Sequence, residues 1–144
     1  MDIASVLRTK GNTIVSVQPT TLLPELASTI ASRRIGAVLV LDDDGNLTGI
    51  VSERDVVKAL ANYGAAVQTM SAGDIMTRTV TTVTPKTTII EAIELMDRGY
   101  FRHLPVLDNG TLLGIISVRD VARARIEREV EENESLHTYI HSRG

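Results

Sequence analysis

The sequence predicts a mixed α/β fold made of two duplicated units, and two observations support it. The segment Gly49–Asp55 (GIVSERD) returns as Gly114–Asp120 (GIISVRD), and 17 of 48 aligned positions in the surrounding repeats are identical. Unrelated sequences of average composition would share only about 3. Both copies also place apolar runs, proline and polar turn residues in the same order. The chain therefore contains an internal repeat, and with 144 residues it is long enough to bury a core without disulfides.

Each copy opens with a β-rich run that ends at a proline, a residue that cannot donate to a strand ladder. An amphipathic helix follows, with apolar residues at helical spacing, and Gly99 is the expected stop in the second copy. Two apolar runs around a tight Asp-rich turn then predict a hairpin, and a second helix completes the unit. The predicted opening strands are Thr13–Pro19 and Thr79–Pro85, and the predicted hairpins are Ala37–Leu41 with Leu47–Val51 and Leu104–Leu107 with Leu112–Ile116.

Each copy therefore has the order strand, helix, strand, strand, helix. The two copies, the segment between them and the segment after them make four parts of the chain. We expect repeat 1 at residues 1–62, a small polar linker at 63–73, repeat 2 at 74–126 and a helical tail at 127–144. The tail has an apolar side, which includes Ile126 and Val130, and we expect it to contact a partner chain; the alternative is an exposed extension. His137 and His141 lie four residues apart, but two ligands without a third are more typical of a solvated helix than of a metal site.

A Ser-x-x-Asp element closes each hairpin, as Ser52 with Asp55 and as Ser117 with Asp120. Such a pair is also a helix capping box, which needs no ligand. Its recurrence in both copies, behind a glycine whose missing side chain would let a ligand approach, favours binding. The carboxylate would then accept ribose hydroxyls, and the helix N-terminus would hold phosphate.

These features resemble the CBS (cystathionine-β-synthase) domain family over nearly all of residues 1–126. Asp74–Thr77 (DIMT) and Phe101–Val106 (FRHLPV) also look like that family's second repeat. The resemblance implies two repeats packed with pseudo-two-fold symmetry, two clefts between them, and two chains assembled into a flat disc of four repeats. In many relatives the clefts accept AMP, ATP, S-adenosylmethionine or NAD-type ligands.

The resemblance and the motifs together predict one set of binding residues for each cleft. We expect the base to lie between aliphatic side chains and to be read by the backbone of the opening strand. The set for the second cleft is Thr82, Val83, Arg102, His103, Leu104, Pro105, Gly114, Ile116, Ser117, Arg119 and Asp120, and the set for the first is Ser16, Val17, Gly36, Ala37, Val38, Gly49, Val51, Ser52, Glu53, Arg54 and Asp55.

Basic residues distinguish the two clefts. Arg102 and His103 precede the hairpin in the second copy, whereas the first copy has Gly36 and Ala37 at these places. An arginine can hold two phosphate oxygens. We therefore expect a phosphorylated ligand in the second cleft, and a neutral adenosyl group or no ligand in the first.

The function predicted is a non-catalytic regulatory module that binds an adenosine nucleotide. AMP is the preferred ligand, and ATP, NAD(H) and S-adenosylmethionine are alternatives. The chain has no cysteine and lacks the glycine-rich and HExxH motifs of common enzyme classes, so we expect no catalytic residue, no metal and no catalytic cofactor. A ligand-free dimerisation module is the first alternative, and a nucleotide-processing enzyme is the second.

The net charge of −3 argues against nucleic acid as a partner. No apolar run is long enough to cross a membrane. We expect a cytoplasmic homodimer that acts on a separate, unidentified effector protein.

Overall fold

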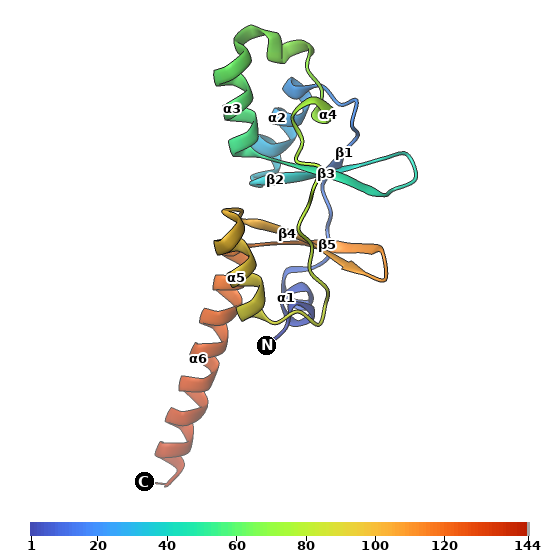
Figure 1. Ribbon diagram of the computed structural model, residues 1–144. Helices are drawn as coiled ribbons and strands as arrows, with labels where there is room; N and C mark the ends of the chain where they lie inside the picture. The colour runs from blue at the N-terminus through green and yellow to red at the C-terminus, as the bar shows by residue number, and fades with distance from the viewer. Residues whose placement is uncertain (144) are drawn as a thin grey trace. The chain divides into compact units, whose positions relative to one another are not determined.

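The protein divides into two compact units that do not follow the order of the sequence (Figure 1). The computed structural model describes residues 1–143, and for 136–143 it describes the backbone alone. Unit 1 combines Met1–Asn12 with Thr82–Gly144, and unit 2 is Thr13–Thr81. The chain thus starts in unit 1, builds unit 2 and returns.

Unit 2 holds a three-stranded sheet in the order β1-β2-β3. The strand β1 runs parallel to β2, and β2 pairs with β3 as the antiparallel hairpin that the sequence predicted. Leu26 and Ile30 pack with Val38, Val40 and Val51 to form the core. The elements of this unit are β1 (Ser16–Val17), α2 (Leu23–Arg33), β2 (Ala37–Leu41), β3 (Leu47–Ser52), α3 (Glu53–Tyr63), the 3₁₀ helix η1 (Gly64–Thr69) and α4 (Ala72–Ile75).

Unit 1 repeats this plan around the hairpin of β4 and β5. Val83 pairs with Val106 of β4 through a single parallel bridge, in the position that β1 takes beside β2. Ile89 and Met96 pack against Leu104 and Ile116 in the core. The elements are α1 (Ile3–Lys10), α5 (Ile89–Gly99), β4 (His103–Asp108), β5 (Thr111–Ser117) and α6 (Val118–Arg143).

The helix α1 was not predicted from the sequence, and it belongs to the core of unit 1. Asp2 caps its N-terminus by accepting a hydrogen bond from the amide of Ser5. Ile3 and Val6, three residues apart, are almost fully buried in the cluster that includes Met96. This N-terminal segment therefore completes the core of the unit that carries the second repeat.

The short helix α4 takes the same place in unit 2 that α1 takes in unit 1. In unit 1 the amides of Ile3 and Ala4 donate to the carbonyls of Thr87 and Pro85. In unit 2 the amides of Ala72 and Gly73 donate to the carbonyls of Thr21 and Pro19, which are the repeat counterparts of Thr87 and Pro85. Each unit is thus completed by a segment that precedes the other repeat in sequence.

The lengths of the opening strands differ from the sequence prediction. The opening strands are much shorter than Thr13–Pro19 and Thr79–Pro85, because only Ser16–Val17 and Val83 pair with a neighbour. The expected linker, 63–73, is folded: η1 packs against α2 and α3, and α4 lies against β3. The compact units and the expected repeat boundaries are therefore two different divisions of the chain.

Gly99 ends α5 as expected, although the left-handed residue is the next one, Tyr100, at φ 57°. A Cβ on Gly99 would overlap the ring of Phe101. Glycine is required here because the aromatic ring packs against the helix end.

The helical tail is the continuation of α6. Ile126 and Val130 are 61% and 48% exposed. Two ion pairs between residues four apart, Arg125 with Glu129 and Arg128 with Glu132, lie on its surface. The side chains of His137 and His141 lie outside the described residues. Within the described part of the chain, none of the helices has both the length and the apolar character of a membrane span.

The packing of α1 leads to a stability prediction. Ile3→Ala should lower the free energy of unfolding by about 2–5 kcal/mol, because it removes a fully buried side chain and leaves a cavity. Thr9→Ala, at an exposed site of the same helix, should change it by no more than about 0.5 kcal/mol. Urea denaturation measures both, and an effect of Ile3→Ala as small as the control would contradict the assignment of α1 to the core.

Candidate functional site

Both Ser-x-x-Asp elements form the capping box that their spacing predicts. The amide of Ser52 donates to Asp55 Oδ2 at 2.9 Å, and the amide of Asp55 donates to Ser52 Oγ at 3.2 Å. In unit 1 the amide of Ser117 donates to Asp120 Oδ2 at 2.8 Å, and the amide of Asp120 donates to Ser117 Oγ at 3.1 Å. Each carboxylate is therefore held at the start of a helix, directly after a strand, with Oδ1 accepting no hydrogen bond from the described residues.

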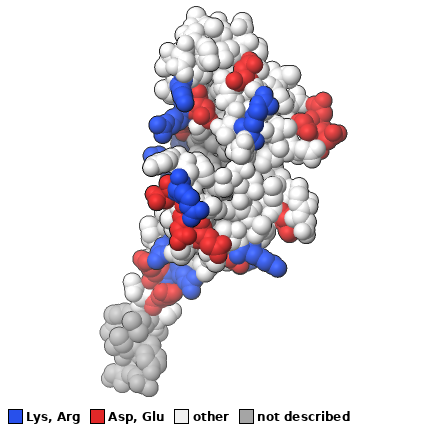
Figure 2. All heavy atoms as spheres, in the orientation of Figure 1, with Lys and Arg blue, Asp and Glu red and all other residues white. Residues whose placement is uncertain are grey.

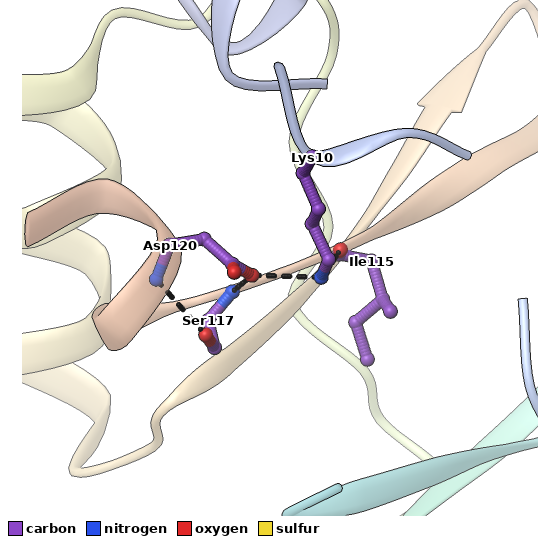
Figure 3. A network of polar contacts seen from close by, with 4 residues as sticks. All are labelled: Lys10, Ile115, Ser117 and Asp120. Carbon is purple, nitrogen blue, oxygen red and sulfur yellow. Dashed lines mark hydrogen bonds and ion pairs between the residues drawn. The ribbon is translucent and has the colours of Figure 1, made fainter. Parts of the chain in front are cut away.

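The two carboxylates differ in one partner, Lys10. This residue ends α1, and its ammonium group lies 2.7 Å from Asp120 Oδ2. The same ammonium donates to the carbonyl of Ile115 on β5, as Figure 3 shows. Within the described residues, Asp55 has no corresponding cation.

This ion pair affects the protonation of Asp120. Burial raises the pKa of the carboxyl group, but the hydrogen bonds from Lys10 and from the amide of Ser117 lower it by more, so that the pKa lies below its usual range. The side chain of Asp120 is 16% exposed, whereas that of Lys10 is 31% exposed. The carboxylate is therefore ionised at neutral pH and partly sheltered from water.

The two units also differ in what bonds to the outer edge of the hairpin, at β3 in unit 2 and at β5 in unit 1. In unit 2 the backbone of Ile50 exchanges two hydrogen bonds with Thr77, which extends the edge of β3. Ile115 occupies the matching position in unit 1, and there its carbonyl accepts the Lys10 ammonium. A side chain thus replaces a backbone segment at the edge next to Asp120.

The glycines of the two motifs have a packing role. A Cβ on Gly49 would lie 2.6 Å from Met76 Sδ, and a Cβ on Gly114 would lie 3.1 Å from Leu7 Cδ2. Met76 directly follows α4, and Leu7 lies in α1. The two side chains take matching places in the two units. The space that we expected a ligand to use is therefore occupied by the chain itself.

The basic residues of the second set lie beside the Asp120 motif. The amide of Val118 donates to the carbonyl of Arg102 at 2.9 Å, and His103 is the β-sheet partner of Ser117. The side chain of Arg102 is exposed. In unit 2 the amide of Glu53 donates in the same way to Gly36, which has no side chain to offer.

Several predicted binding residues point into the core, so only their backbones could contact a ligand. Val83, Leu104 and Ile116 belong to the core cluster of unit 1, and Val38 and Val51 to that of unit 2. The amide and the carbonyl of Val83 are both bonded to β4.

The neighbour of Val83, Thr82, forms no hydrogen bond within the described residues. Successive residues of a strand direct their amide and carbonyl groups to opposite edges. Thr82 therefore offers its backbone on the edge away from β4. Ser16 is the exposed counterpart in unit 2, next to Val17.

Each predicted set thus lies within a single unit: the second set in unit 1 and the first in unit 2. Arg119 is exposed on the first turn of α6, and Glu53 and Arg54 are exposed on the first turn of α3. Pro105 and Ala37 are buried on the strands.

Sequence reasoning missed Lys10, because no motif links it to Asp120 across 110 residues. The only available signal was the amphipathic pattern of Asp2, Ile3 and Val6, which predicts a docked helix.

The surface chemistry is mixed. Acidic and basic side chains are interspersed over the face shown in Figure 2, with an acidic group where the β2–β3 turn carries Asp42, Asp43 and Asp44. Among the described residues, no group of three or more His, Asp or Glu side chains could hold a metal ion.

Comparison with known proteins identifies the family. The chain matches the CBS domain over residues 5–62 and 72–127. It is 36% identical over 112 residues to an uncharacterised 17.7 kDa protein of Acidianus ambivalens, a match that covers 77% of this chain and 66% of that protein. It is 32% identical over 120 residues to the mitochondrial CBS domain-containing protein CBSX3 of Arabidopsis thaliana, covering 81% of this chain and 58% of that protein. The matches therefore span about three fifths to two thirds of these relatives.

Solved structures agree with this assignment. A CBS-domain containing protein of Agrobacterium tumefaciens superposes with a TM-score of 0.84 at 43% identity, covering 86% of this chain and 92% of that one. A CBS domain protein of Pyrobaculum aerophilum, solved in complex with AMP, gives 0.74 at 28% identity and covers 83% and 89%. With two sequence repeats, two matching folded units and a capped Ser-x-x-Asp element in each, the chain belongs to the CBS domain family.

Proposed function

We propose that the protein is a regulatory module that binds an adenosine nucleotide, preferably AMP, at the Ser-x-x-Asp element of unit 1. The observation that carries this proposal is the Asp120 carboxylate, ionised, partly buried and positioned at a helix N-terminus beside Arg102. Its Oδ1 atom accepts no hydrogen bond from the described residues. A diol that donates to this carboxylate places the rest of a nucleotide near the basic side chains.

Each neighbouring group has a role in this proposal. Asp120 accepts the vicinal hydroxyls of ribose, and Arg102 with His103 binds the phosphate. The amides that begin α6 favour an anion at the same place. The backbone of Thr82 contacts the base, because its amide and carbonyl face away from β4. Arg119, exposed one residue before Asp120, is a second phosphate ligand.

Unit 2 offers a weaker site for a phosphorylated ligand. Asp55 presents a matching carboxylate, and Ser16 an equivalent strand position, but Gly36 replaces the arginine. Only Arg54 supplies a cation within the motif. We assign a neutral adenosyl group, or no ligand, to this unit.

Two relatives support an adenosine ligand. The structures of the Pyrobaculum aerophilum protein and of CBSX2 were both solved with AMP, at 28% and 25% identity to this chain. Neither of these two structures was solved with NAD, and we retain NAD only as a test ligand.

The proposal includes a homodimer that passes the signal to a separate effector, in the cytoplasm. Exposed apolar side chains lie on one face of α3, at Val57, Leu60 and Tyr63, and on α5, at Ile90 and Ile93. Such residues favour contact with another chain. Nucleotide binding regulates the effector to the extent that the effector prefers the bound form.

Thermal-shift titration tests the function as a whole. Ligand-stripped protein is titrated with AMP, ADP, ATP, NAD, S-adenosylmethionine and GMP, and adenosine ligands should raise Tm because they bind the folded state alone. No shift with any of these ligands would favour the dimerisation module instead.

Asp120→Ala should abolish AMP binding in unit 1, measured by isothermal titration calorimetry, while lowering the free energy of unfolding by about 1 kcal/mol for the lost cap. Asp74→Ala is the matched control, because Asp74 forms an equivalent capping box with Ser71 outside the predicted sites. Unchanged AMP affinity in Asp120→Ala would refute the ribose assignment.

Arg102→Ala should weaken AMP binding by at least about tenfold, the effect of losing a hydrogen bond to a charged group, and should leave adenosine binding nearly unchanged. Arg98→Ala, another exposed arginine of unit 1, serves as the control. Equal losses for AMP and adenosine would show that Arg102 does not contact the phosphate.

Leu60→Glu should convert the dimer into a monomer in sedimentation velocity experiments, because a charge in an apolar interface is costly. Lys58→Glu changes charge on the same helix and should leave the dimer intact. A monomeric wild-type protein would contradict the dimer.

A further inference from the structure

The Asp120 carboxylate already has two hydrogen-bond partners within the chain. Its Oδ2 atom accepts the amide of Ser117 and the ammonium of Lys10, at 2.8 and 2.7 Å. A carboxylate oxygen has two lone pairs, so both are used, and only Oδ1 remains for a ligand. In unit 2 the corresponding Oδ2 of Asp55 accepts only the amide of Ser52, within the described residues.

A ribose diol that binds in the bidentate way donates one hydroxyl to each carboxylate oxygen, and so uses both Oδ1 and Oδ2. In unit 2 one lone pair of Oδ2 and the whole of Oδ1 are available, whereas in unit 1 Lys10 blocks the second acceptor (Figure 3). Bidentate binding of ribose to Asp120 therefore requires the ammonium to leave Oδ2.

Lys10 can leave without unfolding α1. The start of that helix is held independently, by the Asp2 cap, by backbone bonds to Pro85 and Thr87, and by buried Ile3. Lys10 lies at the last turn, and its side chain is 31% exposed. A lysine side chain has four rotatable methylene groups, so its head group can move while the helix stays docked.

The consequence depends on the charge of the ligand. A neutral nucleoside takes the carboxylate and leaves the ammonium without an ionic partner. A nucleotide takes the carboxylate but supplies a phosphate in exchange, with which the displaced ammonium can pair. The loss of the Lys10 contact is thus compensated only when the ligand is phosphorylated.

We propose that Lys10 is a built-in competitor for the Asp120 carboxylate that makes the site of unit 1 select phosphorylated over neutral adenosine ligands. This inference rests on the proposed nucleotide-binding function and adds a specificity-determining residue to it. Lys10 acts first by excluding ribose from Oδ2 and then by contacting the phosphate.

The test compares adenosine and AMP by isothermal titration calorimetry. All proteins carry Asp55→Ala, which removes the carboxylate of unit 2. Lys10→Met keeps the length of the side chain and removes its charge. Lys86→Met makes the same change at an exposed lysine of unit 1 whose side chain contacts no acidic group among the described residues.

Lys10→Met should bind adenosine roughly two- to fivefold more tightly than its parent, because a partly exposed ion pair no longer has to be broken. The affinity for AMP should rise by less than the affinity for adenosine, or should fall. The ratio of AMP affinity to adenosine affinity should therefore be lower in Lys10→Met than in its parent. Lys86→Met should leave that ratio unchanged.

The possible failures are distinguishable. If the parent binds AMP but Lys10→Met leaves adenosine affinity unchanged or weaker, the competitor role is wrong and the proposed function stands. If the ratio falls equally in Lys86→Met, the effect is one of net charge, and the specific role of Lys10 is refuted. If no variant binds adenosine or AMP, both proposals are refuted together.

Discussion

The fold depends on hydrogen bonds that join each sheet-containing unit to a segment from outside its own repeat. Ile3 and Ala4 bond to the turn after Val83, and Ala72 and Gly73 bond to the matching turn after Val17. These contacts bring buried apolar side chains into cores that would otherwise expose one side of the sheet to water. The same segments place Leu7 and Met76 over the motif glycines, so the geometry of both Ser-x-x-Asp elements follows from this exchange.

The capping box shows how one set of contacts serves structure and function together. Each Asp satisfies the amide of the residue that ends the hairpin, which holds the carboxylate in place before any ligand arrives. A carboxylate oriented in this way loses little conformational entropy on binding. The capping interpretation and the binding interpretation of Ser-x-x-Asp are therefore compatible, and the difference between the units comes from the cations nearby.

Much of the fold was predictable because the signals are local. The hairpins around Asp42 and Asn109, the helix that ends at Gly99 and the two caps follow from turn chemistry and periodicity within a few residues. The CBS family was likewise predictable from the motifs. The docking of α1 and the Lys10 contact were not, because they join residues about 80 to 110 positions apart, and composition carries no information on such pairs. The opening strands were predicted too long because a β-rich run of residues does not indicate how many of them pair with a neighbouring strand.

The exchange of segments also bears on how a duplicated chain of this kind could arise. A single repeat has a leading segment that fits the same place on another copy, since α1 and α4 make matching bonds in the two units. A chain that contained one repeat would therefore complete its core only by lending this segment to a second molecule and receiving one in return. Duplication within one gene would turn such a domain-swapped pair into a single polypeptide whose two halves are free to differ, as the edge contacts of Lys10 in unit 1 and of Thr77 in unit 2 do.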